Sequence, residues 1–513
     1  MSLMTWFEAI ADEVPDRPFI FFEDQVLSYA DIKTRAWRIG SALQGLNVSG
    51  ERVVTMLPND PELLAVQFGI LHAGGITVPL MSDGTSEEMR FFIDDTNPAV
   101  VISTEERWRE VKDLIASLPQ TVILTDIKKS WEEPEGQIKS LTDVEASGEA
   151  RDPVQVPNDE PMAIMYTSGS TARPKGVILD AASFIKDADV QRERFALKDG
   201  ENVLGVLPLF HIAGWHQCLG IALGCRGGMM MQNRFSVSRF WEEIDRTKTV
   251  GGLMMPAMIS FLVSSPEQDD DADHSLRFVL SHWSDSEFER RFNAEIIPVW
   301  GQSELGGLAT SGRVGEKLPT ADCVGWPVPG LVFEIRDEEG NTLTTGQAGE
   351  ICVKSPWVMK GYWGDKKLSD SVLENGWVKT GDKGSLDEEG RLYYGGRLKG
   401  MIKRAGENIS AREVESVIAL HPAVAECVCF GVPDPLRTEE VKVIVVRRPD
   451  AKITFEALIE VCSERLARFK IPRYWEFRKE LPRTPSMKVA IQELKNDHQT
   501  MTGWDRAEEV DSS

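Results

Sequence analysis

The chain has 513 residues, too many for one hydrophobic core, with 42% apolar and 27% charged residues, as is ordinary for a globular protein. Its 57 basic and 81 acidic residues leave a formal net charge of −24, which argues against nucleic-acid or anionic-membrane binding because both need basic surface. Seven cysteines without a CxxC pair indicate reduced, mostly buried thiols. With no signal-peptide pattern at the N-terminus and no long apolar run, we expect a cytoplasmic protein with no membrane insertion and no nucleic-acid partner.

The first part of the chain alternates helical patterns with short apolar runs. Helical periodicity covers residues 29–46 and 61–75, and strand-like runs occupy 52–58, 76–80, 99–104, 121–126, 163–166, 202–210 and 251–257. Strands that alternate with helices of this length predict βαβ units and mostly parallel sheets. Two polar segments, 128–160 and 264–275, are predicted to be a surface excursion and a solvated loop.

The pattern changes after about residue 320. Residues 332–355 and 384–396 are typical of hairpins with Glu-Gly turns. Helical patterns at 411–420 and 454–469 and strand patterns at 425–432 and 441–448 then predict a compact α+β unit. We therefore expect an N-terminal domain over 1–397, a C-terminal domain over 398–495 and a polar tail over 496–513.

One segment is rich in small and hydroxyl residues. Residues 165–177 read MYTSGSTARPKGV and directly follow a predicted strand. Small residues let backbone N–H groups approach an anion, and Lys175 adds a positive charge. The spacing differs from the Walker pattern, so composition alone leaves a phosphate loop and a polar linker both open.

Five motifs in order decide between them. TSGSTARPKG (167–176), WGQSE (300–304), GWVKTGD (376–382), GRLKGMIKRAGENIS (396–410) and PRTPSMK (482–488) resemble the motifs of the adenylate-forming superfamily, which contains acyl-CoA synthetases, luciferases and adenylation domains. The resemblance covers about residues 5–495. It implies an α/β fold: a large N-terminal domain of mostly parallel sheets flanked by helices plus a distorted β-barrel, and a small mobile α+β C-terminal domain.

The resemblance also implies an activity, an ATP-dependent acid–CoA ligase. A small carboxylic acid attacks ATP to give an acyl-adenylate and pyrophosphate, and coenzyme A then displaces AMP. Lys488, Ser303, Glu304 and Lys175 are the implied catalytic residues, with Glu304 holding Mg2+. The implied nucleotide site consists of Thr167, Ser168, Gly169, Ser170, Thr171, Lys175, Trp300, Gly301, Gln302, Ser303, Asp382 and Arg397.

The second half reaction implies a hinge and a thiol site. The motif places the hinge at Lys399, and Ala405 and Gly406 beside the pantetheine, while Lys470 and Arg404 are candidates for the CoA phosphates. For these two basic residues ordinary surface charge is an equally good interpretation. The oligomeric state is expected to be monomer or homodimer.

Three residues depart from the family pattern. Gly400 stands where Asp is common, Ala405 where Gly is common, and Met487 where a Gly usually precedes the catalytic lysine. A side chain in place of Gly restricts the backbone beside Lys488. The context of Met487 leaves open a variant that performs only thioesterification, and an adenylation enzyme that loads a separate carrier protein is a further alternative. A non-enzymatic adenylate-binding regulator is disfavoured because Lys175, Glu304, Asp382 and Lys488 are all present.

The acyl pocket is the least defined part of the site. His211, Trp215, Met254 and Trp283 are its candidate residues, although His211 is equally well explained as a structural histidine. The segments FVLSHWSDSEFERRFN and MIKRAGENIS resemble the crotonobetaine/carnitine–CoA ligase branch. A quaternary ammonium substrate would suit an aromatic cage, for which Trp215 and Trp283 are the candidates.

Overall fold

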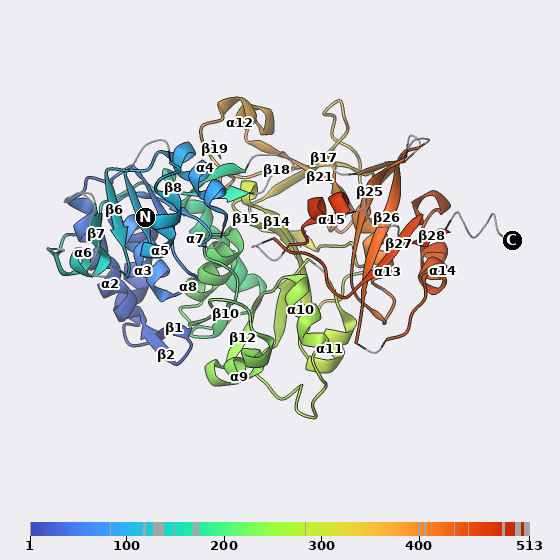
Figure 1. Ribbon diagram of the computed structural model, residues 1–513, viewed down its shortest axis with the longest axis horizontal. Coiled ribbons are helices and arrows are strands. Elements are labelled where there is room, and N and C mark those ends of the chain that lie inside the picture. The colour runs from blue at the N-terminus through green and yellow to red at the C-terminus, as the bar shows by residue number, and fades with distance from the viewer. Residues whose placement is uncertain are drawn as a thin grey trace.

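The computed structural model describes residues 2–82, 84–115, 119–126, 138–147, 149–167, 174–282, 284–398, 401–404, 407–434, 437–449, 451–484, 488–497 and 504–506. The described strands form four sheets. Two large helix-flanked sheets and a smaller antiparallel sheet form the body of the molecule, and the fourth sheet lies apart at the C-terminal end (Figure 1). The predicted α/β class, with a barrel-like sheet and a separate C-terminal unit, is confirmed.

The first large sheet has eight strands in the order β19-β9-β8-β4-β3-β5-β6-β7. Its central strands are buried along their whole length, as expected for parallel strands covered by helices on both faces. Its strands are β3 (Arg52–Met56), β4 (Ile76–Pro79), β5 (Val100–Ser103), β6 (Thr121–Leu124), β7 (Ile138–Ser140), β8 (Pro161–Thr167), β9 (Lys175–Asp180) and β19 (Gly361–Tyr362).

The second large sheet has nine strands in the order β16-β15-β14-β13-β12-β10-β11-β1-β2. Its pairs are parallel from β1 through β11, β10, β12 and β13 to β14, and antiparallel at both edges. Its strands are β1 (Pro18–Phe22), β2 (Gln25–Ser28), β10 (Asn202–Gly205), β11 (Met229–Met231), β12 (Thr249–Leu253), β13 (Phe278–Ser281), β14 (Glu295–Gln302), β15 (Gly307–Ser311) and β16 (Trp326–Pro327).

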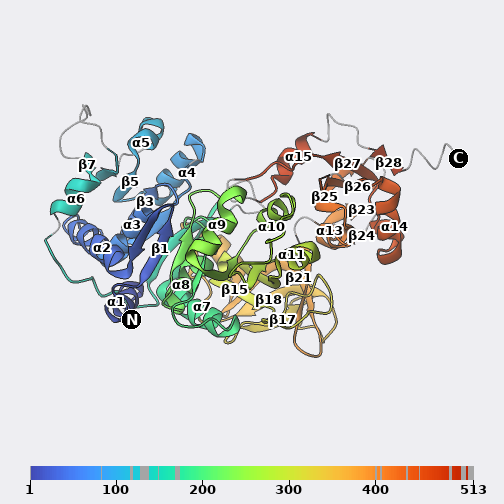
Figure 2. The same cartoon turned by 90° about the horizontal axis from the view of Figure 1, so that it is seen from below.

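The two smaller sheets are antiparallel for the most part. The barrel-like sheet contains β17 (Val332–Arg336), β18 (Gly349–Lys354), β20 (Leu373–Glu374), β21 (Trp377–Leu386) and β22 (Leu392–Arg397). The C-terminal sheet contains β23 (Ile402–Arg404), β24 (Glu407–Ile409), β25 (Val424–Asp434), β26 (Thr438–Arg447), β27 (Tyr474–Arg478) and β28 (Trp504–Asp505). Figure 2 shows this last sheet set apart from the barrel-like sheet.

The helices cover the sheets. They are α1 (Leu3–Glu13), α2 (Tyr29–Gln44), α3 (Pro61–His72), α4 (Ser86–Thr96), α5 (Glu105–Val111), α6 (Leu141–Ser147), α7 (Ala181–Arg194), α8 (Ile221–Gly224), α9 (Val237–Thr247), α10 (Pro256–Val263), α11 (Ser286–Phe292), α12 (Lys366–Val372), α13 (Ala411–Ile418), α14 (Phe455–Arg465), α15 (Ile491–Asp497), the π-helix η1 (Ala213–Gly220), and the short 3-10 turns η2 (Ser303–Leu305) and η3 (Arg468–Lys470). Over the stretches that the structure describes, none of the helices is long and apolar enough to cross a membrane.

Helix α3 shows how the sequence places an element in the core. Asp60 caps its N-terminus by accepting from the Leu63 amide, and Pro61 occupies the first turn, where its missing N–H costs nothing. Every residue of α3 except Glu62 is buried, so the helix packs on all sides rather than presenting one amphipathic face. All seven cysteines are likewise buried and unpaired, which confirms the expectation for the thiols.

One expectation about the organisation was wrong. Residues 128–160 were predicted to be a surface excursion, but part of this segment is structured: β7 adds to an edge of the eight-stranded sheet, and α6 follows it. Leu141 and Val144 are buried there, and Glu145 pairs with Arg35 of α2 at 2.9 Å. Two apolar residues three positions apart form too short a pattern to be recognised as a helix in a polar segment.

Candidate active site

A buried carboxylate forms the centre of the predicted nucleotide site. Asp382 of β21 is 1% exposed, and its Oδ2 accepts from Trp300 Nε1 at 3.0 Å and from Gln302 Nε2 at 2.7 Å. Its Oδ1 faces Arg397 Nε at 2.9 Å, because Asp382 and Arg397 are cross-strand partners. Burial raises the pKa of Asp382, and Arg397, Gln302 and Trp300 oppose the increase. One carboxylate oxygen, Oδ2, is thus held by neutral donors, and the other, Oδ1, faces a cation.

A second cluster links the phosphate-loop strand to Glu304. Tyr362 of β19 donates its hydroxyl to Glu304 Oε1 at 2.9 Å. The Nζ atom of Lys175, at the start of β9, lies 5.3 Å from the centre of the Tyr362 ring. β19 pairs with β9, and the β14–β15 connection carries Glu304. Lys175 and Glu304 are distant in sequence, but both lie next to Tyr362, one near its ring and the other at its hydroxyl.

Lys488 reaches this site from the C-terminal unit. Its carbonyl accepts a hydrogen bond from the Thr484 amide at 2.8 Å. Desolvation by the surrounding protein lowers the pKa of Lys488; the positive charge of Arg397 adds to the decrease, and Glu304 opposes it. Lys488 is therefore within electrostatic range of both Arg397 and Glu304. Its side chain retains exposed surface.

Two histidines face the same lysine. Burial, with a smaller effect of the Lys488 charge, lowers the pKa of His211 to about 3. Desolvation and the charges of Arg412 and Lys488 lower the pKa of His282 to about 3 as well. Both histidines are therefore neutral near pH 7. The position of His211 beside Lys488 is compatible with its predicted place near the acyl group.

The C-terminal unit is held against the body of the molecule by polar contacts. Arg448 Nη2 contacts Asp285 Oδ1 and Oδ2 at 3.2 and 3.0 Å. Ser260 of α10 donates its hydroxyl to the carbonyl of Ala425 at 3.0 Å, and Arg412 donates to the His282 carbonyl. In both views the C-terminal strands lie next to α10 and α11 (Figures 1 and 2). These contacts stabilise the arrangement in which Lys488 faces Glu304.

The predicted acyl-pocket residues divide into two groups. Trp215 and Met254 have no exposed surface, and the Trp215 ring packs against Phe68 and Phe184 at centroid distances of 6.3 and 5.8 Å. Both residues belong to the hydrophobic core, so the expectation that they line an open pocket or cage is not supported. Apolar composition alone does not separate core from pocket. Trp283 lies outside the described residues.

Several other predicted residues also lie outside the described residues. They are Ser168, Gly169, Ser170 and Thr171 of the phosphate loop, Lys399 of the hinge, Ala405 and Gly406 of the thiol site, and the departures Gly400 and Met487. The neighbouring positions are described: Thr167 ends β8, Ser303 is buried at the start of η2, and Gly301 is exposed. The loop was predicted to follow a strand directly. Thr167, the first residue of its motif, is the last residue of β8, which confirms this position.

The two basic candidates for CoA phosphates already have acidic partners. Lys470 Nζ contacts Glu413 Oε2 at 2.8 Å, and Arg404 Nε contacts Glu440 Oε2 at 2.7 Å. Lys470 also lines a groove of about 1190 Å³ between the barrel-like sheet and the C-terminal unit. A phosphate would have to compete with these carboxylates, which favours a structural role for both cations in this arrangement.

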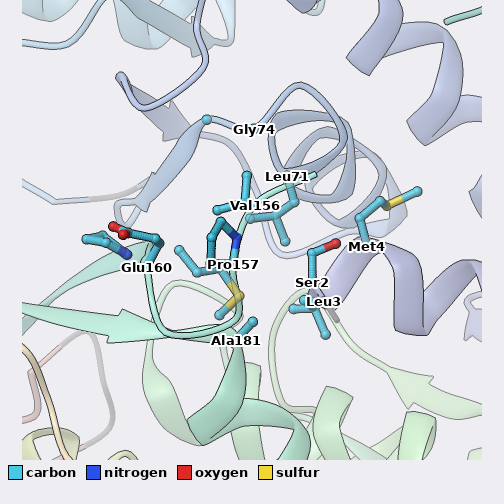
Figure 3. Close-up of a pocket in the computed structure, with 12 residues that line it drawn as sticks. Ser2, Leu3, Met4, Leu71, Gly74, Val156, Pro157, Glu160 and Ala181 are labelled. Carbon is cyan, nitrogen blue, oxygen red and sulfur yellow. The ribbon is translucent and has the colours of Figure 1, made fainter. Parts of the chain in front are cut away.

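A small cavity elsewhere is not a ligand site. It has a volume of about 20 Å³ and lies among α1, the end of α3 and the segment before β8 (Figure 3). Leu3, Leu71, Pro157 and Ala181 are among its lining residues. That volume suits about one water molecule.

Two features of the site have no sequence signal that we recognised. The partner of Glu304 is Tyr362, 58 positions later, and only strand pairing brings them together. The segment after His211 is a π-helix, η1, which is a rare element often found at functional sites. Gly214 is required in it, because a Cβ there would lie 2.1 Å from the Pro208 carbonyl oxygen. That close approach is visible only in three dimensions.

The chain belongs to the AMP-binding enzyme family, whose pattern it matches over residues 7–363, and residues 413–488 match the C-terminal domain of AMP-binding enzymes. It is an AMP-forming acid–thiol ligase. Within the family it is similar to the crotonobetaine/carnitine–CoA ligase of Shigella sonnei (strain Ss046), with 29% identity over 486 residues that cover 91% of this chain and 93% of the relative. The crotonobetaine/carnitine–CoA ligase of Escherichia coli O157:H7 has the same identity and coverage.

Solved structures share the fold. ATP-bound MatB from Rhodopseudomonas palustris superposes with a TM-score of 0.84 and 25% identity, covering 97% of this chain and 99% of that one. A benzoate CoA ligase from Burkholderia xenovorans LB400 gives a TM-score of 0.86 at 21% identity, covering 96% of this chain and 100% of that one. The family matches over residues 7–363 and 413–488 confirm the predicted superfamily.

Proposed function

We propose that this enzyme activates a small carboxylic acid with ATP and transfers the acyl group to coenzyme A. The observation that carries the proposal is the approach of Lys488, from the C-terminal unit, to Glu304 and Arg397 of the N-terminal body. Attack of a carboxylate on the α-phosphate of ATP brings two anions together, so the reaction needs cations and donors at that point. Lys488 and Arg397 are two such cations from different domains.

The residues present suit the parts of ATP. Asp382 is held between Trp300, Gln302 and Arg397, and we assign it to the ribose hydroxyls. Lys175 and the loop 168–171 are assigned to the β- and γ-phosphates. Tyr362 donates to only one carboxylate oxygen of Glu304, Oε1. The second oxygen, Oε2, is the kind of ligand that a hard divalent cation prefers. Glu304 would hold Mg2+, which supplies charge neutralisation at the phosphates when bound.

The acid and the thiol acceptor are proposed from the relatives. Curated relatives named crotonobetaine/carnitine–CoA ligases support a short acid with a quaternary ammonium group and coenzyme A as the thiol. Domain alternation about Lys399, assigned to the hinge, would remove Lys488 after adenylation and admit the thiol. A carrier-protein thiol and a thioesterification-only variant are the two rivals.

ATP–pyrophosphate exchange tests the proposal. We expect exchange with at least one acid of a panel of short aliphatic, aromatic and betaine acids, followed by AMP release that depends on coenzyme A. Exchange without CoA consumption favours the carrier-protein rival. Thioester formation from synthetic acyl-adenylates without any exchange favours the thioesterification-only variant.

A further inference from the structure

A buried acidic residue that the nucleotide site does not use lies on α7, the helix that follows the strand carrying Lys175. The side chain of Asp187 is 6% exposed. Its Oδ2 accepts from Gln191 Nε2 at 2.7 Å and from Gln217 Nε2 at 3.0 Å, and the Leu308 amide also donates to the carboxylate. All three donors are neutral.

The nearest basic group does not neutralise this carboxylate. His216 Nδ1 lies 3.8 Å from Asp187 Oδ2, but burial lowers the pKa of His216 to about 3, so the imidazole is uncharged near pH 7. No lysine or arginine of the described residues pairs with Asp187. Burial with only neutral partners raises the pKa of Asp187 well above its usual range. A carboxyl in this environment is stabilised as an anion when a cation binds near it.

The carboxylate lies against the backbone of the turn that leads from Glu304 into β15. Gly307, the first residue of β15, is the cross-strand partner of Gln302, whose amide holds Asp382. A Cβ on Gly307 would lie 2.7 Å from Asp187 Oδ2, so the carboxylate occupies the side-chain position of residue 307. Gly307 also has a φ of 135°, a conformation that glycine adopts readily.

The surrounding segments adjoin predicted site residues. Gln217 and His216 belong to η1, which begins two positions after His211, and the charge of Lys488 acts on the pKa of His211. Gly306 and Gly307 follow Glu304 with Leu305 between them. Asp187 Oδ2 lies against Gly307 of this turn. In such a desolvated place a charge acts over several ångströms, because little water screens it.

We propose that Asp187 determines specificity by providing the counter-charge for an acid substrate that carries a cationic group at the end remote from its carboxylate. The proposal rests on the proposed ligase function and names its substrate class. It also replaces the aromatic cage, because Trp215 is closed off in the core. The role of Asp187 is one of positioning through charge, with no part in the chemical step.

A matched pair of substrates tests it. One acid carries a terminal trimethylammonium group, and the other carries a terminal tert-butyl group on the same chain, so the two differ in charge but hardly in shape. We expect the wild type to prefer the cationic acid in kcat/KM for adenylation, and Asp187→Asn to lower that preference about 30-fold. The control is Asp189→Asn, which removes an exposed acid two positions further along α7 and is expected to leave the preference unchanged.

The preference, rather than the rate, is the diagnostic readout. A defect in folding or in the amide network lowers kcat/KM for both acids together, and equal loss with an unchanged preference would overturn the proposal. A wild type that activates neutral acids but not the cationic one would overturn it too, while leaving the ligase function intact. If no acid supports exchange in the wild type, the proposed function fails and this proposal fails with it.

Discussion

At the scale of single residues, the site depends on a few side chains whose partners come from other parts of the chain. Lys488 is the only one of the proposed catalytic residues contributed by the C-terminal unit, and it is influenced by Arg397 and Glu304 across the domain boundary. Its compact charge and rotatable donors suit contact with both the attacking carboxylate and the α-phosphate. Its loss should therefore affect one half reaction selectively.

We expect Lys488→Ala to reduce pyrophosphate exchange by at least about a thousandfold, while thioester formation from supplied acyl-adenylate changes by less than about threefold. The role proposed for the lysine is confined to the step in which two anions approach. Quenched-flow measurement of both half reactions on the same preparation checks this. Equal loss in the two steps would contradict the role assigned to Lys488.

Tyr362 should orient Glu304. Tyr362→Phe removes the 2.9 Å hydrogen bond to Glu304 Oε1 but keeps the ring beside Lys175. A hydrogen bond to a charged group contributes about 1.5–3 kcal/mol, so we expect about a tenfold to hundredfold lower rate of adenylation. The Mg2+ concentration needed for half-maximal exchange should rise as well, since Glu304 is then less well fixed. An unchanged Mg2+ dependence with a lowered rate would point to packing instead.

At the scale of elements, α13 combines an amphipathic face with a half-buried acid, Glu415. Val414 and Ile418 pack into the C-terminal core, whereas Glu415 accepts from the Cys429 amide at 2.8 Å. Burial raises the pKa of Glu415 from 4.5 to about 7, with Arg412 opposing the increase. Because the folded-state pKa is raised, the stability associated with protonated Glu415 is present at acidic pH and is lost as the pH rises towards 7.

Glu415→Gln should therefore stabilise the protein at pH 8 and have little effect near pH 4.5. The expected gain in unfolding free energy at pH 8 is of the order of 2 kcal/mol. Chemical denaturation of both proteins at the two pH values measures it. The idea would be abandoned if the difference between wild type and variant were the same at both.

At the scale of the whole molecule, function depends on how the C-terminal unit docks. The contact between Arg448 and Asp285 crosses the domain boundary, and their side chains are 17% and 5% exposed. Removing one partner of a largely desolvated ion pair is costly because the other charge is left unpaired. The docked arrangement, and with it the position of Lys488, should be sensitive to this pair.

We expect Arg448→Gln to lower pyrophosphate exchange about tenfold and to leave thioesterification of supplied adenylate nearly unchanged, since the proposed function assigns the docked arrangement to adenylation alone. Arg290→Gln is the matched control. Arg290 also pairs with an acid of α11, Glu287 at 2.6 Å, but that pair is exposed and stays within one domain. A similar loss of exchange in the control, or equal loss of both half reactions in Arg448→Gln, would show that docking is not the cause.

Sequence patterns were enough to predict the family, the alternation of helices and strands in the first part of the chain, and the residues proposed for the chemical tasks. Its periodicities predicted α2, α3 and the buried parallel strands, because burial imposes a pattern on neighbouring residues. The motifs at 300–304, 376–382 and 482–488 singled out Glu304, Asp382 and Lys488. Each motif contains one of these charged residues together with the Gly, Pro, Ser or Thr residues beside it.

The three-dimensional arrangement was needed to show which of these residues meet and which candidates lie in the core. Tyr362 joins Glu304 through a strand pair, Trp215 and Met254 lie in the core, and Asp187 is buried under a glycine turn. None of these facts leaves a periodic trace, because each depends on contacts between segments far apart in the chain. The physical reason is that burial and electrostatic environment are set by long-range packing, whereas a motif records only what its own few residues require.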